Sequence, residues 1–512
     1  MTGEAALGID VGTTNVKVVL VGPDGALEAT AHRQLRGHQE GDVGEQDAGA
    51  TWSAVASAIR EVTGSAPHVA AQVGPIGCCS QYSSIVPVDA AGEPVGPMVM
   101  WTDKRGTDRS LELLGLPGAM EAWVEHHGIP PVGGGLSLAH MLHLQRDHPE
   151  LHARTATWLE AMDFVNLRLT GVAVANQSTM FMSQLCDNRT LGVTEYDPVL
   201  VGLSGIDADR LPPLARVDEP VGPLRRDVAA DLGLPASAVV HGGVNDTMAA
   251  AIATGAFTPG RGGLSIGTTS VLVDTLDAKR EDLDHELLSM PGPFDDTYVL
   301  WAENGIGGRA LEHILLHVVH AVDVLADHAT DDEFARLDEA LASVPPGSGG
   351  VLFLPWLNGS LSPASSPTMR GGFINMSVGT DRACMVRAVT EGVAHNLAWL
   401  LPHAERFTGQ PMEQLAFLGG AARSRVWSQV LADVLDRPVG PVPHADWAVA
   451  RGVADLARCR HGLIDRAGLE GQVEPEALYE PIDENRAIYA AHQEQFVAAF
   501  EALRPIHEAL NS

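Results

Sequence analysis

The chain has 512 residues, 45% of them hydrophobic and 19% charged, which is typical of a globular protein with two or more domains. Its formal net charge of −32 excludes nucleic acid and anionic membranes as main partners, because both carry the same sign of charge. Five cysteines without metal-ligand spacing argue against a disulfide framework or a zinc site. The sequence contains neither a signal-peptide pattern nor an apolar run of membrane-spanning length, so we expect a cytoplasmic protein.

The first half of the chain alternates strand and helix patterns. β-Branched runs on both sides of Gly12-Thr13-Thr14 predict a strand hairpin over residues 7–20. Apolar spacing predicts a helix over residues 51–62. Further elements expected here are strands at 73–79, 85–88 and 95–101 and helices at 138–145, 163–169 and 247–254.

After Gly255 the pattern begins again around a second turn, Gly267-Thr268-Thr269. The elements expected in this half are a hairpin at 263–273, strands at 297–301, 351–354 and 415–418, helices at 309–319, 380–401 and 425–435, and a helical tail beyond about 470. This repetition predicts an α/β protein of two similar domains, residues 1–253 and 254–512.

The two Gly-Thr-Thr turns favour a clamp for a polyphosphate. A glycine lets backbone N–H groups approach an anion, and the hydroxyls of Thr13, Thr14, Thr268 and Thr269 add donors. One such turn alone is usually a plain hairpin, but two copies half a chain apart indicate an internal duplication. Lys17, beyond the first turn, either approaches phosphate or stays solvated.

Two carboxylates stand beside glycine-rich turns. Asp10 either holds Mg²⁺ next to the phosphates or caps its turn. Asp246 either accepts a proton from an attacking hydroxyl or forms a plain helix N-terminus. Gly419-Gly420 fits a close approach to a flat ligand or a simple turn. Residues 305–310 match a dinucleotide-binding fingerprint only superficially, and a P-loop motif is absent from the sequence.

Six motifs follow one another in an informative order: Asp10-Val-Gly-Thr-Thr14, Gln81-Tyr-Ser-Ser84, Trp101-Thr-Asp103-Lys-Arg105, Gly242-Gly-Val-Asn-Asp246, Ser265-Ile-Gly-Thr-Thr269 and Phe417-Leu-Gly-Gly-Ala-Ala-Arg-Ser424. Together they resemble the FGGY family of carbohydrate kinases, and most of all its xylulokinase branch, over roughly residues 5–460. The resemblance implies two ribonuclease H-like domains of the actin/hexokinase/Hsp70 type. It also implies ATP in the cleft between them and a sugar deep in that cleft.

The resemblance assigns roles to individual residues. It implies that Asp246 is the general base and that Asp10 organises Mg²⁺. Phosphate contacts are expected from Thr13, Thr14, Lys17, Gly267, Thr268 and Thr269, and adenosine contacts from Gly419 and Gly420. Sugar contacts are expected from Gln81, Tyr82, Ser83, Trp101, Asp103 and Asn245.

The sequence departs from the xylulokinase pattern near the expected sugar site. The usual Gln-Met-His-Gly reads Gln81-Tyr-Ser-Ser84, so a hydroxyl-binding histidine is missing while Tyr82 offers one hydroxyl group. Asn375 stands where a glycine is expected, and residues 360–363 replace Glu-Arg-Thr-Pro.

The expected reaction is ATP-dependent phosphorylation of a primary hydroxyl on a small sugar or polyol, D-xylulose first. Glycerol, erythritol, ribulose and a signalling sugar stay open as acceptors. An Hsp70-like ATPase and an inactive sugar sensor are the alternatives from other classes. The sequence leaves a homodimer open.

Overall fold

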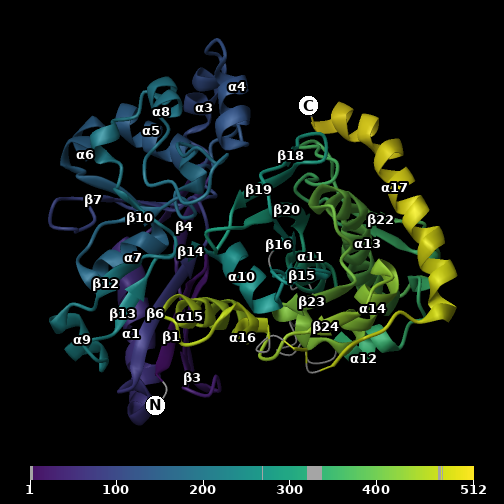
Figure 1. Ribbon diagram of the computed structural model, residues 1–512. Coiled ribbons are helices and arrows are strands. Elements are labelled where there is room, and N and C mark those ends of the chain that lie inside the picture. Colours follow the sequence, from purple (N-terminus) through teal and green to yellow (C-terminus); the bar gives the residue numbers. More distant parts are fainter. Residues whose placement is uncertain (1–3, 268, 320–336, 471–473, 476, 512) are drawn as a thin grey trace.

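Two α/β lobes, one from each half of the chain, make up the protein (Figure 1). The computed structural model describes residues 4–267, 269–319, 337–470, 474–475 and 477–511. Of the helices in these ranges, none combines the length and the apolar character needed to cross a bilayer.

A mixed sheet lies at the centre of the first lobe. In spatial order its strands are β12 (Pro220–Pro223), β13 (Val239–His241), β6 (Val73–Ser80), β1 (Ala5–Val11), β2 (Asn15–Val21) and β3 (Leu27–Gln34), with β14 (Val244–Asn245) also paired to β6. β1 pairs antiparallel with β2 and parallel with β6. Helices of this lobe are α1 (Ala48–Ser65), α2 (Pro67–Ala70), α7 (Ala161–Thr170) and α9 (Arg226–Leu232).

The second lobe repeats this arrangement. Its sheet runs β18 (Glu281–Asp282), β19 (Leu287–Pro291), β20 (Tyr298–Ile306), β16 (Thr269–Val273), β15 (Arg261–Ile266), β23 (Gln414–Leu418) and β24 (Val439–Pro441), with β17 (Thr275–Leu276) paired to β20. The order β20-β16-β15-β23-β24 reproduces β3-β2-β1-β6-β13, with two antiparallel pairings followed by parallel ones. The predicted duplication and the two-domain α/β fold are confirmed.

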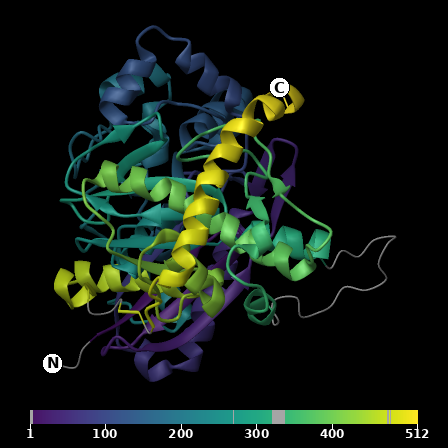
Figure 2. The ribbon, with the colours of Figure 1, turned by 90° about the vertical axis from the view of Figure 1, so that its right-hand side faces the viewer.

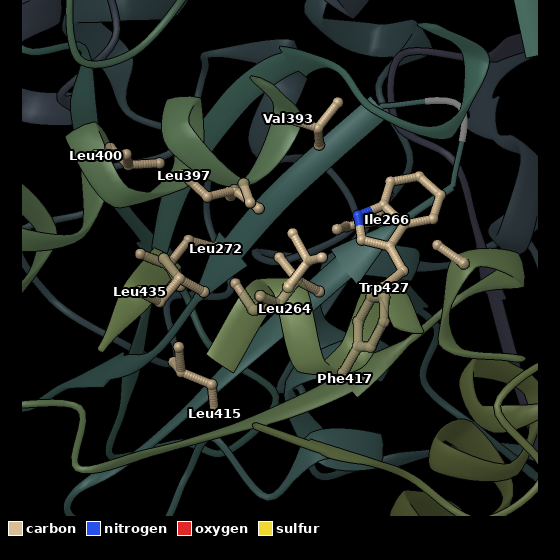
Figure 3. Close-up of a cluster of buried hydrophobic side chains, with 14 of the residues drawn as sticks. Leu264, Ile266, Leu272, Val393, Leu397, Leu400, Leu415, Phe417, Trp427 and Leu435 are labelled. Carbon is tan, nitrogen blue, oxygen red and sulfur yellow. The ribbon is translucent and has the colours of Figure 1, made fainter. Parts of the chain in front are cut away.

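The core of the second lobe lies between its sheet and two helices, α13 (Arg382–Thr408) and α14 (Arg425–Leu435). Figure 3 shows Trp427 of α14 beside Ile266 of β15, with leucines of α13 on the other side of the cluster. Outside this core, α17 (Asp483–Asn511) runs along the lobe surface (Figure 2). It packs against α13 and α14 through Tyr489, Phe496 and Phe500.

Two helices join the lobes. α10 (Asp246–Thr254) ends the first half but contacts β15 and β23 of the second sheet, whereas α15 (Ala448–Arg460) of the second half packs on β1 and β6 (Figure 1). The contact of α15 is tight, because a side chain on Gly8 of β1 would lie 2.0 Å from the Ala450 carbonyl oxygen. Each sheet is therefore covered in part by the chain of the other half.

A smaller subdomain covers one end of the first lobe. Its sheet is β4 (Gly37–Glu40), β5 (Val43–Gln46), β8 (Met98–Val99), β7 (Ile85–Val88) and β9 (Thr157–Glu160). Its helices are α3 (Thr107–Leu114), α4 (Ala119–Ala122), α5 (Ser137–Asp147), α6 (Pro149–Arg154) and α8 (Pro198–Ser204). Elements outside the main sheets are β10 (Ala175–Asn176), β11 (Leu214–Ala215), β21 (Leu352–Leu354), β22 (Gly372–Ile374), α11 (Gly308–Ile314), α12 (Leu337–Ala342) and α16 (Arg466–Glu470).

Some predicted elements have other bounds. The strand expected at 95–101 is only the short β8, because Gly96 and Pro97 interrupt it. The helix expected at 309–319 is α-helical as α11 and continues as a wider π-turn over Leu315–Val319.

Candidate active site

Asp10 and Asp246 meet at one edge of the first sheet. Asp10 lies opposite Cys79 on β6, and on the other side of β6 the same Cys79 lies opposite Val244. Because these strands run parallel, their carboxyl ends share an edge, where α/β proteins commonly bind ligands. Asp246 then opens α10, whose N-terminus is capped by Asn245 Oδ1 accepting from Met248 N at 2.8 Å.

Among the residues that the structure describes, the Asp10 carboxylate lacks a strong partner. Burial raises its pKa to about 7, with Lys17 lowering it and Asp246 raising it further. Its recorded hydrogen bond is a weak one, from the Cys79 thiol at 3.7 Å. Lys17, opposite Asp10 on β2, donates instead to the Asp446 carbonyl of the second half, with an Nζ–O distance of 2.6 Å.

Asp246 is poised for proton transfer. Burial raises its pKa to about 6, although the backbone N–H of Thr247, which donates to Oδ1 at 2.8 Å, lowers it. A carboxylate with a pKa near neutrality is a stronger base than an ordinary aspartate and is still ionised at pH 7. The geometry therefore suits a general base.

Side chains from the subdomain hold the first Gly-Thr-Thr turn. The Gly12 N–H donates to the Asn15 carbonyl at 2.9 Å and closes the turn. Gln46 Nε2 donates to the Thr13 carbonyl at 2.6 Å, and Trp101 Nε1 donates to Thr13 Oγ1 at 3.1 Å. Thr14 is exposed, with its Oγ1 accepting from the side chain of Asn15. The Thr13 hydroxyl keeps its own proton for a ligand.

The second turn is held by backbone instead. Gly267 N–H donates to the Thr269 carbonyl at 3.0 Å, and Gly308 N–H donates to the Gly267 carbonyl at 2.8 Å. A side chain on Gly307 or Gly308 would lie 2.8 or 2.7 Å from those carbonyl oxygens. Thr268 lies outside the described residues. The Gly305–Gly308 segment, which sequence reasoning left without a role, therefore supports this turn, and the adjacent glycines at a helix start were its signal.

A pocket of 560 Å³ opens beside the second turn. It is lined by Ile266, Gly267, Gly308, Arg309, Leu311, Glu312, Leu337, Asp338, Gly420, Ala421, Arg423, Ser424 and Trp427. Gly419, next to it, has φ +98°, and a side chain there would lie 2.4 Å from the Ile266 carbonyl oxygen. Gly420 faces open space. The predicted glycines thus lie at the pocket, and its volume falls in the range of small-molecule sites.

Asp338 is a pocket residue that sequence reasoning missed. Its carboxylate accepts from the Ser424 hydroxyl and from Arg425 N–H, so it braces the start of α14. No local pattern marks this role, since the partners are more than eighty residues apart.

The segment 81–84 enters the cleft from β6. Gln81 is 5% exposed, and its Oε1 has no partner within the described residues. Tyr82 reaches the second lobe, with its hydroxyl group 3.4 Å from Met290 Sδ. Ser83 takes φ +53°, a left-handed conformation that is rare outside glycine. Ser84 N–H donates to the buried Glu160 at 3.0 Å, which anchors the segment.

Trp101 and Asp103 occupy different settings. Trp101 is half-exposed at the cleft, beside Thr13. Asp103 is fully buried, and its oxygens accept from Arg105 and from the Gly44 N–H at 2.9 Å. Although burial raises the pKa of Asp103, these hydrogen bonds hold it below its usual value. Asp103 therefore fixes the turn that carries Trp101 and Arg105, and its contact with a sugar stays a prediction.

Asn375 illustrates how the chain accommodates a departure from its expected pattern. The residue has φ +60°, a left-handed conformation that favours glycine and so accounts for the glycine expected at this position. Asparagine tolerates this conformation better than most residues, and its Nδ2 donates to the Gly350 carbonyl at 2.9 Å.

Known proteins match along nearly the whole chain. The FGGY family model for the N-terminal domain of carbohydrate kinases matches residues 5–253, and the C-terminal model matches residues 262–459. A xylulose kinase of Staphylococcus epidermidis is 26% identical over 98% of this chain and 97% of its own length. A glycerol kinase of Gloeobacter violaceus is 31% identical over 85% of this chain and 84% of its own.

A solved structure agrees with this assignment at the level of the fold. The crystal structure of the xylulose kinase from Rhodospirillum rubrum superposes with a TM-score of 0.84 at 24% identity, covering 98% of this chain and 100% of that one. Sequence and fold agree, and the chain belongs to the FGGY family of carbohydrate kinases.

Proposed function

We propose that this kinase transfers the γ-phosphoryl group of ATP to a primary hydroxyl of D-xylulose. The observation that carries the proposal is the pairing of Asp10 and Asp246 at the edge of the first sheet. Across the cleft, the second lobe offers the Gly267 turn and the 560 Å³ pocket. The Staphylococcus epidermidis xylulose kinase, similar over nearly its full length, supports the choice of acceptor.

In this proposal Asp246 removes the proton of the attacking hydroxyl. Its Oδ1 is held by the backbone N–H of Thr247, which fixes the carboxylate and leaves Oδ2 for the hydroxyl. As the proton moves to Asp246, the oxygen gains the charge it needs to attack phosphorus in line.

The residues present fit a magnesium ion at Asp10. Within the described residues its carboxylate accepts only a weak hydrogen bond, from the Cys79 thiol, which leaves its oxygens available to a cation. Among the described residues no group of three or more His, Cys, Asp or Glu side chains could hold a metal. Mg²⁺ typically needs one or two carboxylates together with substrate phosphates. When bound, the ion would neutralise charge on the transferred phosphate.

The two turns would hold the phosphates from opposite lobes. Thr13 and Thr14 offer hydroxyls from the first lobe, and in the second lobe Gly267, where a side chain would meet open space, leaves room for a phosphate beside the turn. The adenosine would lie in the pocket against Gly420, with Gly419 allowing the chain to pass close to β15. We place the domain boundary near residue 254, where α10 ends.

The proposal is tested by ADP release from Mg-ATP with D-xylulose, ribulose, erythritol, glycerol and gluconate as acceptors. We expect release that depends strictly on the acceptor and is fastest with D-xylulose. A preference for glycerol would change the proposed acceptor but keep the proposed kinase chemistry. Glycerol is the first alternative because of the 31% identical glycerol kinase. Acceptor-independent hydrolysis would instead indicate an ATPase, and absence of release with binding of sugar would indicate a sensor.

A further inference from the structure

One face of β20 points at the first lobe. Tyr298, Leu300 and Ala302 are buried in the core of the second lobe, whereas Val299 and Trp301 pack into a cluster shared by both lobes. Side chains alternate along a strand, so Glu303 lies on the same face as Val299 and Trp301. A carboxylate therefore points into the cleft from the lobe opposite Asp246.

The same cluster brings this face against the expected acceptor segment. Tyr82 belongs to it, and the Tyr82 hydroxyl contacts Met290 on β19, whose strand partner is Val299. Glu303 is also within electrostatic reach of Asp246: burial first, and then the charge of Asp246, raises the pKa of Glu303. Tyr82 and Glu303, on the two walls of the cleft, thus both lie within electrostatic reach of Asp246.

Both walls of the cleft hold polar groups without partners. Glu303 is half-buried, and no described residue donates a hydrogen bond to its carboxylate. On the opposite wall, Asn245 is 0% exposed, yet its Nδ2 has no partner within the described residues, and neither has Gln81 Oε1. Buried polar groups are nearly always hydrogen-bonded, because leaving them unpaired costs free energy. A molecule that both donates and accepts hydrogen bonds would satisfy these groups.

A metal ion bound by the three carboxylates does not explain these unpartnered polar groups. In the described part of the chain, Asp10, Asp246 and Glu303 are not grouped closely enough to ligate one ion together. Hydroxyl groups do explain them, since each can donate to Glu303 and accept from the Asn245 amide.

We propose that Glu303 binds hydroxyl groups of the acceptor and makes the site selective for neutral polyhydroxy compounds over sugar acids. The inference rests on the proposed function and adds to it a residue from the second lobe. An acceptor carboxylate would be placed among Asp10, Asp246 and Glu303, where repulsion between like charges opposes binding.

The first test compares D-xylulose with D-xylonate, which has the same number of carbons and one carboxylate. We expect kcat/KM for D-xylulose to exceed that for D-xylonate by about 100-fold or more. Equal use of the two would overturn the selectivity while leaving the kinase assignment intact. If the protein phosphorylated neither compound and no other acceptor, the proposed function and this inference would both be overturned.

The second test changes Glu303 itself. Glu303→Gln keeps the shape and removes the charge, so KM for D-xylulose should rise about 5- to 10-fold while KM for ATP stays within about twofold. The preference over D-xylonate should relax by about tenfold. Glu303→Ala, which removes the hydrogen bond altogether, should raise KM for D-xylulose by about 10- to 100-fold.

Glu286→Gln is the matched control. Glu286 also contributes to the electrostatic field at Glu303 but is the last residue of the β18–β19 turn and does not belong to β20. Removing the charge of Glu286 should leave KM for the acceptor within about twofold of that of the unchanged protein. Unchanged acceptor KM and unchanged D-xylonate discrimination in both folded Glu303 variants would overturn the inference alone.

Discussion

The two Gly-Thr-Thr turns occupy equivalent places in the two lobes but are held in different ways. Side chains of Gln46 and Trp101 fix the first turn, and charged residues Asp10 and Lys17 lie next to it. The second turn is fixed by the backbone of Gly307 and Gly308, packed too closely for any side chain. The same duplicated unit is therefore held by side chains beside a charged pair in one lobe and by closely packed backbone in the other.

The largest expected effect comes from removing the base in the first lobe. Asp246→Asn should lower kcat by roughly 10²-fold or more, since the hydroxyl then loses its proton acceptor. Nucleotide affinity should stay close to that of the unchanged protein, because the nucleotide pocket belongs to the second lobe. Steady-state kinetics and nucleotide titration measure both, and near-normal turnover would reject Asp246 as the base.

The next largest effect is expected from changing a glycine beside the turn of the second lobe. Gly308→Ala places a methyl group 2.7 Å from the Gly267 carbonyl oxygen and should displace the turn. We expect KM for ATP to rise about tenfold with KM for the acceptor nearly unchanged, since overpacking commonly costs 1–3 kcal/mol, roughly.

Gly202→Ala serves as the control for that change, because a side chain at Gly202 meets open space in α8. If Gly308→Ala raised KM for the acceptor instead of ATP, the division of roles between the lobes would be wrong.

The pH dependence tests the environment of Asp246. Asp246 must be ionised to accept a proton, and burial raises its pKa to about 6. At saturating Mg²⁺, kcat/KM for the acceptor should therefore be level above pH 7 and fall about tenfold per pH unit below pH 6. An acid limb near pH 4, the value of an ordinary aspartate, would show that Asp246 is open to water.

The smallest expected effect comes from removing the hydrogen bond between Trp101 and Thr13 in the first turn. Trp101→Phe keeps the ring but removes the N–H that donates to Thr13 Oγ1 at 3.1 Å. The loss of one such hydrogen bond is worth about 1 kcal/mol, so kcat/KM should fall about fivefold. Trp52→Phe, on α1 and stacked with Arg168 instead, is the matched control and should leave the rate unchanged. Equal kcat/KM in the two variants would show that the hydrogen bond from Trp101 does not order the turn.

Sequence patterns predicted best where neighbours in the chain decide the structure. The helix expected at 425–435 has those bounds, because the Ser424 side chain caps its N-terminus and accepts from Trp427 N–H. Both hairpins and the edge that carries Asp10 and Asp246 follow from strand patterns repeated along the chain. The order of motifs was sufficient to identify the family.

Long-range packing escaped prediction. The adjacent Gly307 and Gly308 signal a close approach, but they do not reveal that the partner is the Gly267–Thr269 turn. Glu303 sits in an ordinary strand pattern, and only the meeting of the lobes places it opposite Asp246. The pattern around Asp103 likewise does not reveal that its carboxylate accepts hydrogen bonds from both Arg105 and Gly44 N–H.

The exchange of α10 and α15 has a consequence for how this chain can be divided. A cut near residue 254 would leave β1 and β6 without the helix that covers them and would leave the apolar side of α10 in water. Each fragment produced alone should aggregate, whereas the two halves made together in one cell should reassemble into an active enzyme. We therefore expect the two matched domains to depend on each other for folding, because each covers part of the other's sheet.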